Sequence, residues 1–195
     1  MAGDGDGDGV YLAKCGRKLI EGNLCSDTYA TRWLKELPAK VNIFIWRMLL
    51  NKLLTRMNLM SRGITVQSNQ CGICDTGDET INHLMLHCDI ARDVWALVGR
   101  WWNLDFPFVL SIREQLSWVD GSRIHGVACG CWKSGTTFWS IWKFRNQNVF
   151  QKENKAILFD SIVSTSFFWL SNRNTKLSIN WIGFLQDPIM ACNSL

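Results

Sequence analysis

The sequence predicts a mostly α-helical protein, a small helical domain built around one metal-pinned turn. Apolar residues recur at the helical period along several segments. Helix-capping residues and glycines stand at the ends of those segments. One short segment combines three cysteines with histidines at the spacing of metal ligands. Hydrophobic residues make up 47% of the chain, which is enough for a buried core.

The clearest helix is predicted in LPAKVNIFIWRMLLN, which covers 37–51. Pro38 suits the first turn, because its missing N–H would have no partner there. An apolar stripe at the helical period consists of Val41, Phe44, Ile45, Met48 and Leu49. Three more apolar residues widen this stripe to most of the circumference: Ile43, Trp46 and Leu50. We therefore expect a central core helix whose one exposed edge carries Lys40, Arg47 and Asn51.

Shorter elements are predicted on both sides of this helix. The stretch 10–20 has a mixed pattern, which indicates a short strand and then a helix that ends near Gly22. Thr55 is a good N-cap, so a short helix is expected to follow it. Gly63 is expected to end that helix after Arg62.

Four further helices are predicted. One begins at Asp89, a good N-cap, and one covers 112–118. Another starts at Thr136, after glycines that leave the preceding stretch ambiguous, and the last covers 156–170. The residues expected to face inward are Val94, Trp95, Val98, Trp101, Trp102, Trp139, Trp142, Val149, Phe159, Ile162, Val163 and Trp169. The segment INWIGFLQDP closes the fold, and Pro188 is expected to end it.

The segment CGICDTGDETINHLMLHC carries the strongest chemical signal in the chain. Two residues separate Cys71 from Cys74, so one tight turn, eased by Gly72, can aim both thiolates at one ion. His83 and Cys88 follow after a gap long enough to return across that ion. Three thiolates and an imidazole suit tetrahedral zinc, and four protein ligands make a structural rather than a catalytic site. The sequence therefore predicts a zinc-bound CCHC turn.

Two parts of this assignment have alternatives. The CxxC pair could be a redox pair or an unmetallated structural pair. A redox pair normally begins a helix after a strand, whereas the polar QSNQ precedes Cys71. His87 follows His83 on one helical face, so these two could bind together. Cys88 fits only if the helix ends there, which an N-cap at Asp89 favours. We prefer Cys88.

The compartment follows from the same cysteines. No N-terminal apolar segment resembles a signal peptide, and the longest apolar run, FFWL, is far shorter than a membrane span. We therefore expect reduced cysteines, no membrane partner and an intracellular location, in the nucleus or cytoplasm. The cysteines without ligand spacing are expected to be small buried residues: Cys15, Cys25, Cys129, Cys131 and Cys192.

Charge is distributed unevenly around the net value of +4. Lysines and arginines greatly outnumber acids between Lys14 and Arg62, whereas acids dominate from Gly63 to Asp93. A basic segment suggests a polyanionic partner, RNA or DNA, although basic runs are commonly just solvated surface. The residues expected to contact phosphates are Lys40, Arg47, Lys52, Arg56 and Arg62.

Four stretches resemble a known family: TRWLKELPAKVNIFIWRMLLNKLLTRMNLMSRGI, CGIC, ETINHLMLHC and VWALVGRWW. They are similar to the reverse transcriptase zinc-binding domain of plant LINE-type (non-LTR) retrotransposon polyproteins. The later FWSIWKFRNQNVF and SFFWLSNR resemble the region that follows that domain. The usual proline before Thr55 is Leu54 here, which weakens the helix cap. The resemblance implies metal ligands at Cys71, Cys74, His83 and Cys88.

The chain is expected to have three parts. Residues 1–9, with the run GDGDGDG, form a disordered tail. They are not a calcium loop, because the glutamate required at its twelfth position is Cys15 here. Residues 10–105 form the zinc-binding domain, and 106–195 form a helical extension packed on it. The start at Met1, just ahead of the match, suggests a severed polyprotein tail.

Catalytic groups are lacking in the sequence. A polymerase needs clustered carboxylates for two metal ions, and no two aspartates are adjacent. Of the three histidines, His125 has no motif around it and the others belong to the CCHC segment. We therefore expect a non-enzymatic, zinc-stabilised, nucleic-acid-binding accessory module of a retrotransposon reverse transcriptase. The alternatives are a structural module docking on a polymerase domain and a decayed element without a present role.

Overall fold

The computed structural model describes residues 33–121, 129–150, 156–173 and 179–193. Within these ranges the chain is mostly helical, and strand-like pairing is limited to the antiparallel bridge between Gln70 and Asp78. The predicted fold class is confirmed. The tail predicted at 1–9 and the strand and helix predicted at 10–22 lie outside the described residues, as does His125.

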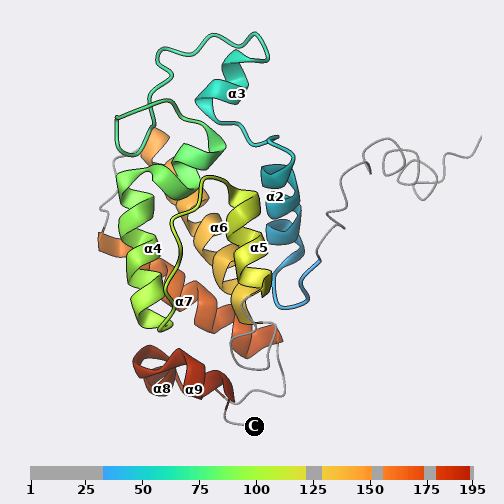
Figure 1. The fold of residues 1–195 in the computed structure, drawn as a ribbon, viewed down its shortest axis with the longest axis vertical. Helices are drawn as coiled ribbons and strands as arrows, with labels where there is room; N and C mark the ends of the chain where they lie inside the picture. Colours follow the sequence, from blue (N-terminus) through green and yellow to red (C-terminus); the bar gives the residue numbers. More distant parts are fainter. Residues whose placement is uncertain (1–32, 122–128, 151–155, 174–178, 194–195) are drawn as a thin grey trace, which may run out of the picture. The chain divides into compact units, whose positions relative to one another are not determined.

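Helix α6 (Cys129–Phe150) lies at the centre of the described fold (Figure 1). It contacts α2 (Ala39–Leu49), the π-helical turn η1 (His83–His87), α5 (Ile112–Gly121) and α7 (Ala156–Arg173). Two predictions were therefore wrong. The helix begins well before Thr136, and the central place expected for 37–51 belongs to α6.

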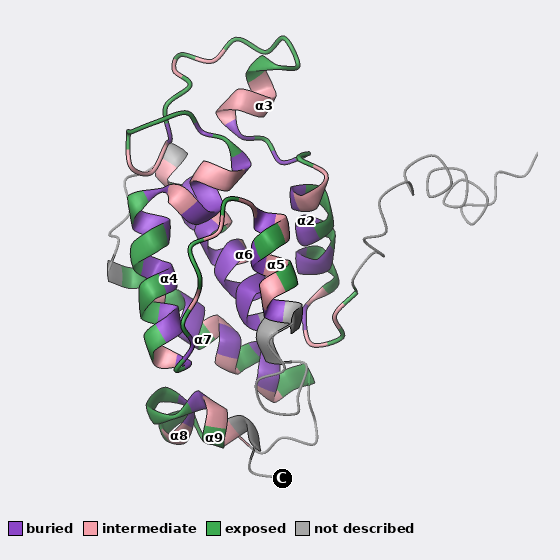
Figure 2. Cartoon of the chain, in the orientation of Figure 1, coloured by how far each residue is buried: buried purple, intermediate pink, exposed green. Residues whose placement is uncertain are grey.

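The first turns of α6 were not predicted because they contain two glycines, Gly130 and Gly135, which are poor helix formers. The buried face of α6 mixes apolar rings with small hydroxyl side chains, all buried: Ser134, Thr136, Thr137, Phe138, Ser140 and Ile141. The apolar period is weak in such a helix, although Figure 2 shows α6 buried along much of its length. Trp139 and Trp142, predicted to face inward, are only half-buried and contact Phe44 of α2.

Helix α2 lies against α6 with one face and is open to solvent on the other. Of the five stripe residues, Leu49 is half-buried. The other four are buried: Val41, Phe44, Ile45 and Met48. Ile43 is 46% exposed and Trp46 is 41% exposed, so the exposed edge is wider than predicted. Asn42 is buried instead, because its side chain accepts from the amide of Leu34 and donates to the carbonyl of that residue.

The next two helices begin close to where the sequence placed them. Thr55 caps α3 (Arg56–Met60), its hydroxyl accepting from the amide of Asn58 at 3.3 Å. Gly63, with φ +76°, ends the turns that follow. In α4 (Asp89–Trp101), the cap position belongs to Cys88 rather than Asp89, which is the first helical residue.

The remaining helices complete the core. In α7, Ile162, Val163 and Trp169 are buried as predicted, and Phe159 is half-buried. Two short helices follow, α8 (Trp181–Gln186) and α9 (Pro188–Asn193). Pro188 therefore begins a helix, where proline is favoured, instead of ending the fold. Among the described helices, none has the length and apolar character needed to cross a bilayer.

Candidate metal centre

A tight reversal of the backbone brings the first two cysteines together. The bridge between Gln70 and Asp78 closes the reversal, and the amide of Cys71 donates to the carbonyl of Gly77 at 2.9 Å. Asp75 and Gly77 have positive φ, at 56° and 65°. These residues make the turn, rather than Gly72, which was expected to ease it. The reversal leaves Cys71 and Cys74 on the side that faces η1.

The other two side chains come from the π-helical turn η1. Its backbone bond runs from the amide of Cys88 to the carbonyl of His83 at 2.7 Å, a five-residue step. This step places His83 and Cys88 on one face. Cys88 then leaves the helix with ψ 134°, so the helix ends where the sequence required it to end. The indole N–H of Trp95 donates to the carbonyl of Met85 at 2.8 Å, which satisfies a carbonyl in the turn.

The four side chains converge on one point. One ligand atom from each of Cys71, Cys74, His83 and Cys88 lies within 4.8 Å of every other. Cys71 and Cys88 are completely buried, and Nε2 of His83 lies 3.3 Å from Sγ of Cys74. Zinc bonds to sulfur at about 2.3 Å, so tetrahedral ligand atoms stand about 3.8 Å apart. The group therefore fits a tetrahedral ion and could hold a metal.

The buried thiols are electrostatically linked. A hydrogen bond with Cys88, the largest influence, lowers the pKa of Cys71 from 9.0 to about 5, although burial opposes this change. The same bond, with burial, raises the pKa of Cys88. The two sulfurs therefore share one proton between them and titrate as a pair. A divalent cation between them would replace that proton, because a coordinating thiol is deprotonated outright.

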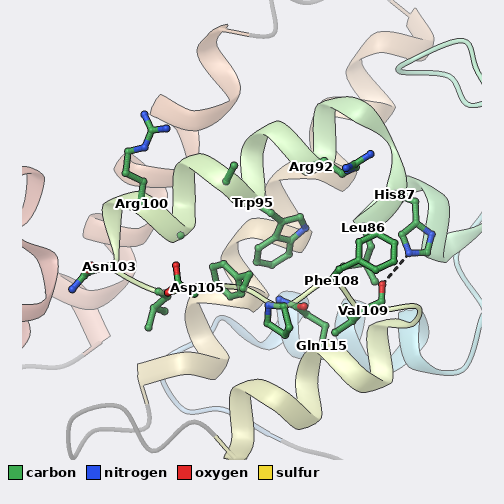
Figure 3. Close-up of a pocket in the computed structure, with 15 residues that line it drawn as sticks. Leu86, His87, Arg92, Trp95, Arg100, Asn103, Asp105, Phe108, Val109 and Gln115 are labelled. Carbon is green, nitrogen blue, oxygen red and sulfur yellow. Dashed lines mark hydrogen bonds between the residues drawn. The ribbon is translucent and has the colours of Figure 1, made fainter.

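His87 lies outside the group, although the sequence left it as an alternative ligand. Its ring points toward the segment after α4, where Nε2 is 3.0 Å from the carbonyl oxygen of Val109 (Figure 3). The ring also stacks on Phe108, with centroids 6.0 Å apart and planes 24° apart. The structure thus brings His83, and not His87, to the cysteines.

Residues 15–95 match the family described as zinc-binding in reverse transcriptase. This part of the chain is similar to the zinc-binding domain of reverse transcriptases. The match includes all four members of the cysteine–histidine group. In reverse transcriptases this zinc-binding domain is an accessory part, separate from the catalytic polymerase domain. No curated protein and no solved structure matches the chain.

The matched segment contains a second feature that the sequence did not reveal. Glu79 is completely buried, and its carboxylate accepts hydrogen bonds from the amide of Arg56 and the amide of Gly72, both at 2.9 Å. It also pairs with the guanidinium of Arg145 in α6. The acid therefore joins α3, the CxxC turn and the central helix. Because its partner lies 66 positions away, local sequence patterns contain no signal for it.

Gly72 lies directly against this acid. A Cβ at position 72 would be 3.2 Å from Oε2 of Glu79 and 3.6 Å from the guanidinium of Arg56. The absence of a side chain therefore lets the CxxC turn approach the carboxylate. This contact, and not turn geometry, accounts for glycine at that position.

The five basic residues predicted to meet phosphates do not share one environment. Lys40, Arg47, Lys52 and Arg62 are exposed. Arg56 is half-buried, and its guanidinium donates to the carbonyl of Gln70 at 2.7 Å. Arg56 therefore holds the edge of the CxxC turn, which leaves less of its donor capacity for a phosphate.

Proposed function

We propose that the chain binds one zinc ion through Cys71, Cys74, His83 and Cys88. The convergence of these four ligand atoms within a domain of a zinc-binding family carries the proposal. Zinc supplies a closed tetrahedral link and no open coordination position. The protein positions the ligands: the reversal closed by the bridge at Gln70 presents Cys71 and Cys74, and the turn η1 presents His83 and Cys88.

Zinc content of the purified protein tests this proposal. One ion per chain is expected, with Zn–S distances of about 2.3 Å by X-ray absorption. A Cys71→Ser, Cys74→Ser double variant should lose the ion. His83→Ala should lose most of it, whereas His87→Ala, the matched control, should retain it. Full retention in the cysteine variant, or greater loss from His87→Ala than from His83→Ala, would show that the ligands are different.

We further propose that the chain is a nucleic-acid-binding accessory module of a LINE-type retrotransposon reverse transcriptase of plants. Four exposed cations support this role: Lys40, Arg47, Lys52 and Arg62. None has a carboxylate partner among the described residues, so each is available to a phosphate. Phosphate contacts position a strand but do not read bases. Sequence preference from this surface should be weak.

Salt dependence of RNA binding tests the second proposal. If about four cations touch a single strand, log affinity falls with log salt at a slope of about −3. Arg47→Glu with Lys52→Glu should weaken binding several-fold at low salt and make the slope shallower by about 1.5. The matched control is Arg92→Glu with Arg100→Glu, which reverses the charge of two exposed arginines. Both are in α4, which lies on the other side of α6 from α2 in Figure 1. Equal effects of the two pairs would contradict the proposal.

A protein-docking role is the second candidate, supported by the C-terminal helices. Three large apolar side chains there are well exposed: Ile182 at 62%, Leu185 at 42% and Met190 at 65%. Clustered apolar exposure is typical of interaction surfaces. Titration with a reverse transcriptase polymerase domain separates the two roles. Saturable binding that Ile182→Glu abolishes, without any binding of RNA, would favour docking.

A further inference from the structure

A groove lies between α2 and α6 beside the exposed basic residues. Its volume is about 510 Å³, within the range of roughly 300–1,000 Å³ of pockets that hold small ligands. The residues that matter most in its lining are Lys40, Phe44, Arg47, Leu53, Trp139 and Trp142. It is therefore a place where an apolar, aromatic floor meets the cations proposed to hold phosphates.

The floor of the groove is aromatic. Trp139 and Trp142 are half-buried, and both contact the buried ring of Phe44, at centroid distances of 5.3 and 6.2 Å. A guanidinium carbon, that of Arg145, lies 5.3 Å from the centre of the Trp142 ring. Rings held this way offer large, rigid surfaces to a flat partner at little entropic cost.

The rim of the groove is positively charged. Lys40 and Arg47 project from α2, and Nζ of Lys40 lies 5.7 Å from the centre of the Trp139 ring. No aspartate or glutamate is among the described residues that line the groove. Arg145 also lines the groove, but its ion pair with Glu79 neutralises its positive charge. The groove thus presents net positive charge around aromatic rings.

We propose that this groove takes an unpaired base of a single-stranded nucleic acid, while Lys40 and Arg47 contact the flanking phosphates. The inference rests on the nucleic-acid-binding function proposed above. Aromatic stacking with basic residues along the backbone is how proteins hold single strands without sequence preference. A base inside a duplex is paired and stacked on both faces, so it does not enter such a groove. The module therefore prefers single strands to duplexes.

The larger groove between α4 and the segment after it fits a nucleotide less well. Its volume is about 600 Å³, and Asp105 lines it together with Arg92 and Arg100 (Figure 3). This mixed charge does not favour a phosphate, because Asp105 would repel it.

Fluorescence anisotropy with the full zinc-loaded chain tests the inference. The probes are a labelled oligouridylate of about eight nucleotides, an abasic strand of equal length, and the corresponding duplex. The abasic strand keeps the phosphates but has nothing to stack, so it should bind about tenfold more weakly than the oligouridylate. Trp142→Leu should remove this difference without changing binding of the abasic strand. Trp33→Leu, at a tryptophan that is 59% exposed and lies outside the groove, should change neither.

A second measurement keeps the test independent of folding in the variant. Irradiation of the unmodified protein with a 5-iodouridine strand should crosslink a peptide that contains Trp139 or Trp142. Equal affinity for the abasic strand and the oligouridylate, with a steep salt slope, would overturn the groove but leave the phosphate-binding function intact. Crosslinks confined to other peptides would overturn it as well. If no strand binds, the proposed function itself fails.

Discussion

Among single residues, Glu79 connects three separate parts of the fold through its side chain. It is completely buried, and its carboxylate has partners on α3, on the CxxC turn and on α6. Burying a charge is costly unless it is paired and fully hydrogen-bonded, and both conditions hold here. The acid therefore links the CxxC turn to the central helix.

Removing that charge should destabilise the whole unit. In Glu79→Gln the guanidinium of Arg145, at 10% side-chain exposure, is left without its counter-charge. Losing one partner of a buried pair costs about 3–5 kcal/mol of unfolding free energy, measured by urea denaturation of the zinc-loaded protein. Asp93→Asn, on the exposed side of α4, is the control and should change stability by less than about 0.5 kcal/mol. If Glu79→Gln lowers the unfolding free energy as little as Asp93→Asn does, the ion pair contributes little to stability.

The thiols predict how zinc retention depends on pH. Zinc requires deprotonated ligands, so protons compete with the ion, and affinity falls as pH falls. In the metal-free protein Cys71 and Cys88 hold one proton between them, because the pKa of Cys71 is lowered to about 5 and that of Cys88 is raised. Zinc binding must displace that proton. We expect zinc to be retained at about pH 7 and released progressively below about pH 5, as measured by a chromogenic chelator after rapid dilution. Retention that is independent of pH over this range would contradict thiolate ligation.

At the scale of elements, caps could be read from the sequence and irregular turns could not. Thr55 and Gly63 bound the α3 region because an N-cap hydroxyl and a positive φ are local requirements. The turn η1 was not foreseen, since nothing in HLMLH distinguishes a five-residue turn from an ordinary one. The choice of Cys88 as a ligand needed only that the helix end at that residue. Gly130 and Gly135 likewise hid the first turns of α6.

The turn between Cys74 and His83 contains Gly77, whose role can be tested by comparison with Gly63. Gly77 has φ +65°, and a Cβ there would lie 3.3 Å from Cε1 of His83. Gly63 has φ +76° and nothing within 4 Å. Both alanine variants should lose about 1–2 kcal/mol of unfolding free energy for the left-handed conformation. Only Gly77→Ala should also weaken zinc binding, by displacing the imidazole. Equal zinc affinity in the two variants would show that His83 tolerates the contact.

At the scale of the molecule, the described helices from Trp33 onward form one compact unit. The predicted division into residues 10–105 and a later extension stays a prediction. The contacts show how closely the two stretches depend on each other, because α2 packs on α6 and Gly135 admits the side chain of Leu37. Such long-range packing could not be derived from the sequence, since the segments of α2 and α6 each have the pattern of an ordinary apolar helix.

A chain truncated after Asp105 should therefore fold poorly. It would expose Phe44 and Ile45, which lie against Trp139 and Gly135 of α6, and it would leave Glu79 without Arg145. We expect aggregation, or loss of cooperative unfolding followed by circular dichroism, even with zinc present. A chain that starts at Trp33 and keeps the later helices is the control and should unfold cooperatively. A cooperative transition in the short chain would show that the first stretch is self-sufficient.

The pairing of Glu79 with Arg145 also predicts how the two positions vary among related proteins. The family match ends at residue 95, so its boundary separates a buried anion from the cation that neutralises it. A relative that keeps the acid but has lost the later helix needs a replacement cation, from elsewhere in its chain or from another protein. A relative without the acid has no need of the arginine. Across an alignment, the two positions should therefore be gained and lost together.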